Sequence, residues 1–268
     1  MRHGQGWLVD THAHLTDPAF DADRDTVLAS AASRGVQLIV AVGADLDSSE
    51  RSLNLARSVA GVLAAVGIHP HDAAQATPRA LDQLRQWAAD PQVVAVGETG
   101  LDYYRMRAPR DAQLRALEAH LAIADEVDKP VVVHDRDAHA DLLAVLAPWT
   151  ERRRQAGKRS APGVLHCFSG DLAMAQAAVA AGFYVSFAGN VTFANAGPLA
   201  EVARQIDLAS VVLETDSPYL APAPLRGHRN EPANVVVIAQ WLADQRGLSL
   251  MDVADETSDN ARRLFGLG

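Results

Sequence analysis

The chain has 268 residues, of which 49% are hydrophobic and 21% are charged, and its formal net charge is −9. This composition can bury a core and excludes an intrinsically disordered protein. The negative charge argues against a large nucleic-acid-binding face, which is usually basic, but leaves a phosphodiester substrate open. No apolar run approaches the roughly 18 residues of a membrane span, so we expect no contact with the membrane interior.

The cellular compartment is indicated by two further features. The single cysteine, Cys167, excludes an intramolecular disulfide and fits a reducing compartment. The first six residues lead into the first apolar run without the apolar segment of a secretory signal. We therefore expect a cytoplasmic protein, and no feature of the sequence points to an obligatory protein partner.

Short apolar runs and helical patterns alternate along the whole chain. From the N-terminus, we expect strands at 7–13, 36–43, 62–68, 93–98, 131–135, 163–167, 183–188 and 211–215. We expect helices at 22–34, 49–60, 78–89, 110–127, 138–147, 171–181, 197–206, 231–245 and 250–265. Such alternation implies parallel strands joined by right-handed crossovers, and about 250 residues is typical of a barrel. The sequence predicts an α/β fold, a single-domain (β/α)8 TIM-type barrel over residues 1–268; the alternative is a doubly wound open sheet.

One polar, arginine-rich segment at 148–162 stands out from this pattern. It joins the fifth helix to the sixth strand, which places it on the face of the barrel opposite the C-terminal ends of the strands. Active sites of such barrels lie at those C-terminal ends. We therefore interpret the segment as a solvated basic loop rather than a nucleic-acid contact.

Residues able to bind metal ions fall at or just after the C-terminal ends of five predicted strands. They are His12, His14, Glu98, His134, His166 and Asp216. The strand ends of a barrel meet at one mouth, where the active site is built. No structural requirement explains imidazoles and carboxylates delivered there by five separate segments. The pattern predicts a two-metal hydrolase.

The spacing of these residues suggests how they divide between two ions. His12 and His14 are two apart on a strand, so their side chains point to the same side and can chelate one ion. Glu98 lies midway between this pair and the pair of His134 and His166, which makes it the natural bridge. Imidazole and carboxylate ligands together suit zinc, manganese, iron or magnesium and do not fix the metal.

Three aspartates complete the predicted site. Asp216 would bind an ion and face the attacking water, whose proton a carboxylate there can accept. Asp102 and Asp10 are expected to orient imidazoles from behind the metal ligands. Asp10 has an alternative role, which is to cap the tight loop after the first strand.

Seven motifs follow one another in order over nearly the full chain. They are DTHAH at 10–14, GIHPH at 67–71, GETGLDY at 97–103, HDRDA at 134–138, HCFSG at 166–170, ETDSPY at 214–219 and RGHRNEP at 226–232. Together they resemble the TatD family of metal-dependent deoxyribonucleases, which belongs to the amidohydrolase superfamily. The resemblance implies a TIM-type barrel with two divalent ions, magnesium, manganese or zinc, that hydrolyses the phosphodiester bonds of DNA, we expect as an exonuclease.

The resemblance also assigns individual roles. It gives one ion to His12, His14, Glu98 and Asp216, and the other to Glu98, His134 and His166. His69 would contact the substrate phosphate or a metal-bound water. Members of the family commonly have a lysine where this chain has His228, which is mostly neutral at pH 7.

The expected mechanism is in-line hydrolysis by a water that two ions, roughly 3.5–4 Å apart, activate. Asp216 would accept the proton, and His69 with Arg136, Arg226 and Arg229 would stabilise the charge at phosphorus. An arginine of the 226–229 segment could instead pair with a carboxylate in a structural role. Tyr103 and Phe187 are candidates to stack on a base, with core packing favoured for Phe187.

Two other classes of function stay open. One is a hydrolase of esters or amides, such as one that deacylates D-aminoacyl-tRNA, which would use the same metals. Within that class, cyclic-amide hydrolases that bridge their metals with a carbamylated lysine are disfavoured, because Lys129 and Lys158 are the only lysines and lie at the wrong end of the barrel. The other is a non-catalytic metal-binding protein.

Overall fold

The barrel is built from eight strands in one sheet, ordered β1 to β8, with every neighbouring pair parallel. The computed structural model describes residues 7–158 and 160–267, so the prediction about the first six residues lies outside the described residues. The strands are β1 (Leu8–Ala13), β2 (Val36–Val42), β3 (Val62–Val66), β4 (Val93–Asp102), β5 (Val131–Arg136), β6 (Gly163–Leu165), β7 (Tyr184–Phe187) and β8 (Val211–Leu213).

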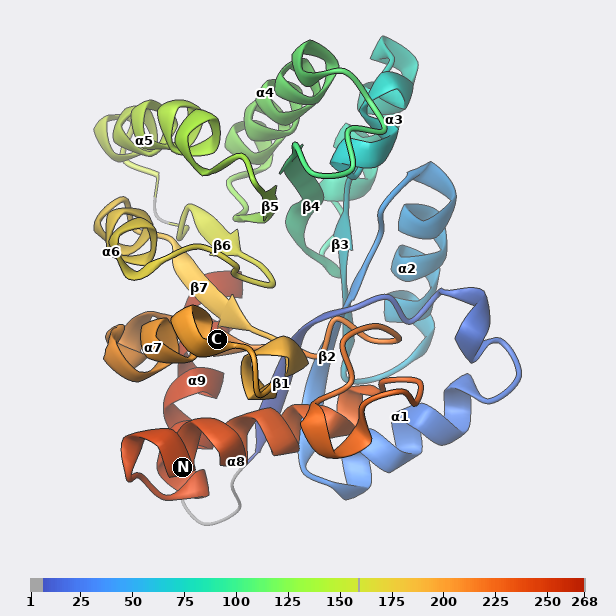
Figure 1. The fold of residues 1–268 in the computed structure, drawn as a ribbon. Coiled ribbons are helices and arrows are strands. Elements are labelled where there is room, and N and C mark those ends of the chain that lie inside the picture. The colour runs from blue at the N-terminus through green and yellow to red at the C-terminus, as the bar shows by residue number, and fades with distance from the viewer. Residues whose placement is uncertain (1–6, 159, 268) are drawn as a thin grey trace.

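Nine α-helices accompany the strands in the described part of the chain, and most of them pack around the outside of the barrel (Figure 1). They are α1 (Arg24–Ser33), α2 (Leu46–Ser58), α3 (Pro78–Ala88), α4 (Arg110–Val127), α5 (His139–Gln155), α6 (Leu172–Ala180), α7 (Gly197–Gln205), α8 (Val235–Arg246) and α9 (Leu250–Phe265). The predicted single-domain (β/α)8 barrel is confirmed. No helix of the described residues is both long and apolar enough to cross a membrane.

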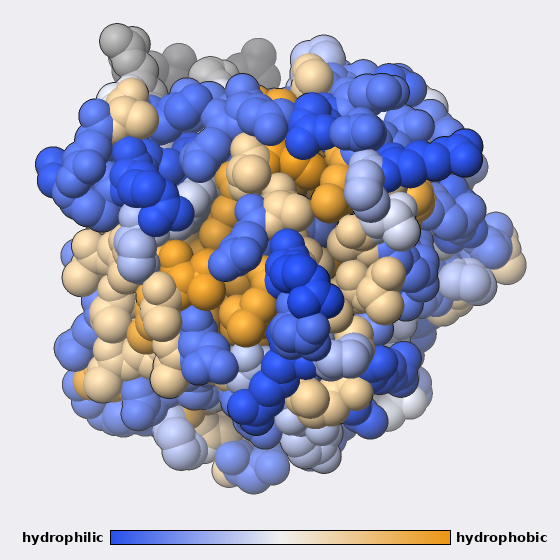
Figure 2. Space-filling model, turned by 90° about the horizontal axis from the view of Figure 1, so that it is seen from above, coloured by the Kyte–Doolittle hydropathy of each residue, from blue (hydrophilic) through white to orange (hydrophobic). Residues whose placement is uncertain are grey.

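Continuous apolar runs form these strands because both of their faces are covered, by helices outside and by packed side chains inside. All six residues of β1 and all ten residues of β4 are buried. Seen from above in the view of Figure 1, the outer face around α3, α4 and α5 is mainly hydrophilic at its margin (Figure 2). Hydrophobic residues are visible in the hollow at its centre.

The seam between β8 and β1 closes the ring through residues of the predicted site. The backbone N–H of Asp216 donates to the carbonyl of His12 at 2.9 Å, and that of His14 donates to Ser217 at 2.8 Å. Lower in the barrel, the Thr11 hydroxyl donates to the carbonyl of Leu213 at 3.0 Å. The last strand thus delivers Asp216 directly beside the two histidines of the first.

The helix boundaries follow capping chemistry. Thr77 caps α3, with Pro78 at the first helical position, because its hydroxyl accepts the N–H of Ala80. At α2 the cap is Asp45, and Ser48 is its reciprocal partner three residues later in a capping box. The helix therefore begins three residues before the predicted start at residue 49.

The sequence predicted that the arginine-rich segment at 148–162 is a loop, but its first half is helical. Helix α5 continues through Pro148 to Gln155. Arg153 is buried, donates to Asp125 at 2.7 Å, and lies with its guanidinium carbon 4.9 Å from the ring centroid of Trp149. These contacts on one face stabilise the helix past Pro148 as far as Gln155, eight residues beyond the predicted end at residue 147.

Candidate active site

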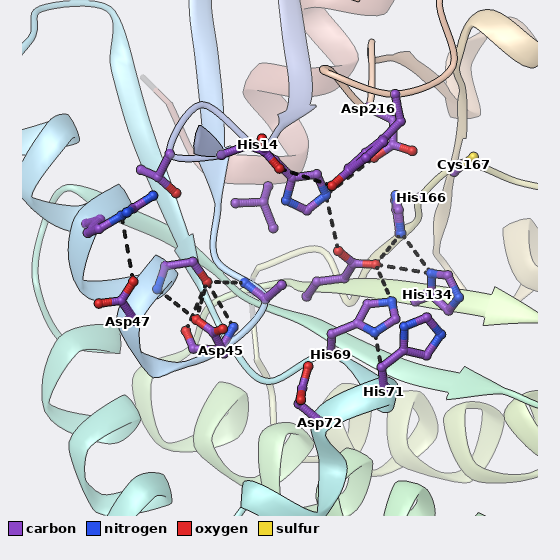
Figure 3. Close-up of a pocket in the computed structure, with 18 of the residues that line it drawn as sticks. His14, Asp45, Asp47, His69, His71, Asp72, His134, His166, Cys167 and Asp216 are labelled. Atoms are coloured by element: carbon purple, nitrogen blue, oxygen red, sulfur yellow. Dashed lines mark hydrogen bonds and ion pairs between the residues drawn. The ribbon is translucent and has the colours of Figure 1, made fainter. Parts of the chain in front are cut away.

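The predicted metal ligands gather in a cavity of about 650 Å³ at the C-terminal end of the barrel (Figure 3). The residues of this group that line the cavity are His14, Glu98, His134, His166 and Asp216, with His69 beside them. His12 is fully buried next to them at the end of β1. The folding of the barrel therefore brings together the six predicted metal ligands and His69.

Glu98, in β4, stands between two groups of histidines. Its Oε2 lies 3.5 Å from Nε2 of His12 and 3.8 Å from Nε2 of His14. Its Oε1 lies 2.7 Å from Nε2 of His166 and 3.1 Å from Nδ1 of His134. One carboxylate thus presents one oxygen to each group, which is the geometry that a bridge between two ions needs.

Asp216 belongs to the first of these groups. Its Oδ1 lies 3.4 Å from Nε2 of His14 and 3.7 Å from Nε2 of His12. Asp216 follows β8 with a left-handed backbone (φ 54°), a conformation that is strained for residues other than glycine and that clusters at functional sites. His12, His14 and Asp216 together could hold one cation.

The spacing of the imidazole nitrogens tests whether metal ions fit. Nε2 of His12 and Nε2 of His14 are 3.3 Å apart, and so are Nδ1 of His134 and Nε2 of His166. Two nitrogens bound to one tetrahedral ion at about 2.0–2.1 Å stand roughly 3.3 Å apart. With carboxylate oxygens beside each pair, the donor atoms fit a divalent cation on either side of Glu98.

Burial and the local charges act in opposite directions on this centre. Burial raises the pKa of Glu98, but the surrounding histidines, His166 foremost, outweigh it and hold this pKa well below its usual value. Burial lowers the pKa of His166, but Glu98 and then Glu214 outweigh it and raise this pKa well above its usual value. The centre therefore keeps its carboxylate ionised in a buried place, where a cation is the natural partner.

His69 differs from the other histidines in the way that its ring is hydrogen-bonded. The backbone N–H of His71 donates to its Nδ1 at 3.0 Å, which leaves the proton of a neutral ring on Nε2, 3.3 Å from Oε1 of Glu98. Burial is the main cause that lowers the pKa of His69 to about 3, and the neighbouring histidines lower it further. A neutral imidazole with its N–H pointing into the cavity is a donor, which suits contact with a phosphate oxygen better than metal binding.

Asp102 orients imidazoles, as the sequence predicted. Its Oδ2 accepts a hydrogen bond from Nε2 of His71 at 2.7 Å and lies 3.5 Å from Nε2 of His134. Burial raises the pKa of Asp102, but hydrogen bonds from His134 first, then from the N–H of Arg105 and from His71, hold it well below its usual value. His71 was not assigned a role from the sequence, although the GIHPH motif contains it.

Asp10 has neither of its two predicted roles, because its main contacts cross the barrel seam to Thr215. Its carboxyl accepts the N–H and the hydroxyl of Thr215 at 2.8 and 2.6 Å and the N–H of His12 at 3.3 Å. Burial raises its pKa to about 8. Asp10 thus ties the end of β1 to the end of β8 through backbone groups rather than orienting a ring.

Close packing fixes the distance between the two strands that carry Glu98 and His134. Gly100 has φ 140°, and a Cβ built there would collide with the backbone carbonyl of His134. Only glycine therefore allows β4 to approach β5 at this level.

The three arginines expected to bind substrate lie in different surroundings. None of the three is among the residues that line the cavity, and Arg229 donates to Asp23 at 2.7 and 2.8 Å and to Glu231 at 2.9 Å. Arg136, at the end of β5, is exposed, with its guanidinium carbon 5.1 Å from the ring centroid of Tyr104.

The arginines that do line the cavity are Arg51, Arg105 and Arg107. None of the three was predicted from the sequence, because none belongs to a motif. Arg105 and Arg107 lie in the loop after β4, whose path the sequence does not reveal, and Arg51 lies in α2.

The aromatic residues exposed at the mouth are not the two that were predicted to stack on a base. Phe187 is fully buried, as favoured, and the hydroxyl of Tyr103 donates to Asp141 at 2.8 Å. The exposed rings at the mouth are instead Tyr104, at 59% exposure, and Tyr219, at 53%.

Comparison with known proteins agrees with the resemblance seen in the motifs. The family model described as TatD related DNase matches residues 9–266. The chain is 41% identical to the uncharacterized metal-dependent hydrolase YcfH of Escherichia coli K12, over 97% of this chain and 96% of YcfH. It is 36% identical to the 3′-5′ ssDNA/RNA exonuclease TatD of the same organism, over 97% of this chain and 99% of TatD.

A solved structure shows the same fold. The crystal structure of the TatD homolog YJJV from Escherichia coli K12 superimposes with a TM-score of 0.87 at 30% identity, over 97% of this chain and 98% of that chain. The family model spans nearly the whole barrel, and these relatives align with this chain almost from end to end. The chain therefore belongs to the TatD-related DNase family and is a metal-dependent hydrolase.

Proposed function

We propose that this protein hydrolyses phosphodiester bonds of DNA, working from a strand end, with two divalent ions bound on either side of Glu98. The observation that carries the proposal is the position of the Glu98 carboxylate, whose two oxygens face two separate groups of imidazoles. A relative at 36% identity carries the name 3′-5′ ssDNA/RNA exonuclease, which supports a nucleic-acid substrate.

The two ions would be held by the sets that the sequence assigned. His12, His14, Glu98 and Asp216 surround one position, and Glu98, His134 and His166 surround the other. Magnesium, manganese and zinc are the candidates, since the mixed nitrogen and oxygen ligands accept all three. Bound there, the ions would supply Lewis-acid chemistry to the phosphate and lower the pKa of a water.

A lysine bridge has no place in this centre. Nζ of Lys129 donates to the carbonyls of Ala88 and Asp90 at 2.6 and 2.8 Å. Nζ of Lys158 donates to the carbonyl of Asp125 at 2.6 Å. Both ammonium groups are engaged away from the cavity, which supports Glu98 as the bridge.

The chain's own groups would carry the proton and the developing charge. Asp216, 14% exposed in its side chain, is positioned to take the proton of the attacking water on its carboxylate. The Nε2–H of His69 points into the cavity and would donate to a phosphate oxygen. The guanidiniums of Arg105 and Arg107 line the same cavity and favour a negatively charged substrate over a neutral ester or amide.

An end-labelled nuclease assay tests this proposal. Single-stranded and duplex DNA labelled at either end would be incubated with the protein in magnesium, manganese or zinc, beside carboxylic ester and D-aminoacyl-tRNA substrates. We expect mononucleotides released progressively from one end of DNA. Turnover of the esters or the acylated tRNA without DNA cleavage would replace the proposal by the second class of hydrolase.

A further inference from the structure

The loop between β4 and α4 presents large side chains to solvent at the rim of the cavity. Tyr104 is 59% exposed and Met106 is 43% exposed, although both are large hydrophobic residues. Arg105 and Arg107, on the same loop, are exposed and line the cavity. Exposed hydrophobic side chains that gather at one place mark a binding surface more often than scattered ones do.

Hydrogen bonds from buried groups hold the backbone of this loop, so it can present these side chains in a fixed arrangement. The buried amide of Gln113 accepts the N–H of Asp102 at 2.7 Å and donates to the carbonyls of Asp102 and Ala108 at 3.1 and 2.9 Å. The carboxylate of Asp102 accepts the N–H of Arg105 at 2.6 Å. A surface that is ordered before binding loses less conformational entropy when a ligand arrives.

The guanidiniums of this region are not neutralised by the protein. Among residues 7–158 and 160–267, no ion pair engages Arg105, Arg107 or Arg136. The guanidinium carbons of Arg105 and Arg136 lie 5.4 and 5.1 Å from the ring centroid of Tyr104. We call Tyr104, Arg105, Arg107 and Arg136 the basic sector of the mouth.

The segments that follow β1 and β2, including the first turn of α2, carry the opposite charge. Asp17, Asp45 and Asp47 line the cavity there, and Figure 3 shows Asp45 and Asp47 on the far side of the cavity from His134. Arg51, which also lines the cavity on this side, lies 3.8 Å from Asp47. A polyanion that reaches the metal centre is therefore repelled by one side of the mouth and attracted by the other.

We propose that the basic sector binds the nucleotides next to the scissile phosphate of a single-stranded nucleic acid. Arg105 and Arg107 contact backbone phosphates, and Tyr104 stacks on an unpaired base. The inference rests on the proposed function, since it takes the reacting phosphate to lie at Glu98. A single strand fits better than a duplex, because the face of a base is free to meet a tyrosine ring only when the base is unpaired.

Binding measurements on the metal-loaded protein test the assignment. The probe is a fluorescent, cleavage-resistant phosphorothioate oligonucleotide, whose affinity is followed by anisotropy at several salt concentrations. The Arg105→Ala/Arg107→Ala variant should bind about tenfold more weakly, and its log–log salt slope should fall by roughly 1.4, since each phosphate contact on a single strand contributes about 0.7. Arg115→Ala, which removes an exposed arginine of α4 outside the cavity, is the matched control and should bind like the parent.

The aromatic contact has its own test. Tyr104→Ala should weaken binding by about tenfold, which lies within the usual effect of losing one stacked base, whereas Tyr104→Phe should keep parent affinity. An oligonucleotide with an abasic site at the stacked position should bind the parent and Tyr104→Ala equally. Equal losses for the intact and abasic probes would instead assign Tyr104 to the support of the loop and overturn the stacking.

Failure of this inference can be told apart from failure of the proposed function. Hydrolysis of bis(4-nitrophenyl) phosphate by the parent protein reports phosphodiester chemistry without any neighbouring nucleotide. If the parent cleaves this ester and DNA while the arginine variant binds the oligonucleotide with unchanged affinity and salt slope, the basic sector is not the strand site. If the parent cleaves neither compound, the proposed function itself is wrong.

Discussion

The two sides of the mouth hold their metal-binding residues by different means. On the side of β1 and β8, the backbone itself sets the positions: Asp216 pairs with the carbonyl of His12, and His14 pairs with Ser217. The carboxyl of Asp10 adds further hydrogen bonds across the same seam. Here the strands deliver the site as part of closing the barrel.

On the side of β3 and β4, buried side chains of α4 hold the strand ends. Nε2 of His120 accepts the N–H of Ile68 at 2.9 Å, next to His69, and its Nδ1 donates to the carbonyl of Ala116 at 2.7 Å. Gln113 holds the backbone of Asp102 in the same way. A change in one helix can therefore loosen this side while the other side stays in place.

Glu98→Gln should have the largest effect, because Glu98 is the one group that both sides share. An amide keeps one oxygen but loses the charge that attracts the second cation. We expect bound metal to fall, by elemental analysis, and turnover to drop by more than the 10- to 100-fold typical of a residue that only supports a ligand. The exposed Glu118, on α4, offers Glu118→Gln as a control. Normal turnover with two ions still bound would remove the bridge from the proposal.

Asp216→Asn should affect the β1/β8 side alone. The amide preserves the shape of the side chain and one oxygen ligand but removes most of the basicity. Turnover on DNA should fall by roughly 10²–10⁴, the usual span for a positioned acid or base, while at least one metal and DNA binding are kept. A folded variant that loses its metals would make Asp216 chiefly a ligand, and activity within a few fold of the parent would move the base elsewhere, with His69 the next residue to test.

His120 should make the β3/β4 side sensitive to acid. Burial lowers the pKa of His120 from 6.5 to about 4 in the folded protein, so the unfolded chain binds the extra proton first. Its contribution to stability is complete above pH 6.5 and is lost as the pH falls towards 4, at a cost on the order of 3 kcal/mol.

His120→Gln isolates this contribution, since glutamine can still accept the N–H of Ile68 but does not titrate. Urea unfolding of the parent and of this variant would be compared between pH 7 and pH 5. The parent should lose more stability than the variant over this range. Parallel pH profiles would show that His120 is not the acid-sensitive group.

The contrast between the two sides also explains what sequence could predict. The sequence predicted which strand ends carry the candidate ligands, because an apolar run followed by His, Glu or Asp indicates both the strand and where it ends. The extension of α5 past Pro148 was missed because it depends on Arg153 meeting Asp125, a contact distant in sequence. Arg105 and Arg107 were missed for a different reason, since the path of their loop depends on hydrogen bonds to the buried amide of Gln113 that no motif indicates.

The smallest effect should come from Arg229→Ala, at the edge of the β1/β8 side. The sequence left two roles open for Arg229, contact with phosphate or a structural ion pair. In the structure it pairs with Asp23 and Glu231, and its guanidinium carbon lies 4.8 Å from the ring centroid of Phe20. The hydrogen bonds to Asp23 and Glu231 raise the pKa of Arg229 above its usual range. Its donor groups are therefore already bonded within the protein.

We therefore expect the melting temperature of Arg229→Ala to fall by roughly 1–3 °C, as for a partly exposed ion pair in a domain of this size. The Michaelis constant for oligonucleotides should stay within about twofold of the parent, in contrast to the tenfold loss of affinity expected for the arginines of the basic sector. A large rise in the Michaelis constant without a change in melting temperature would return Arg229 to the substrate site. It would also mean that the strand leaves the metal centre along β8 and not along β4.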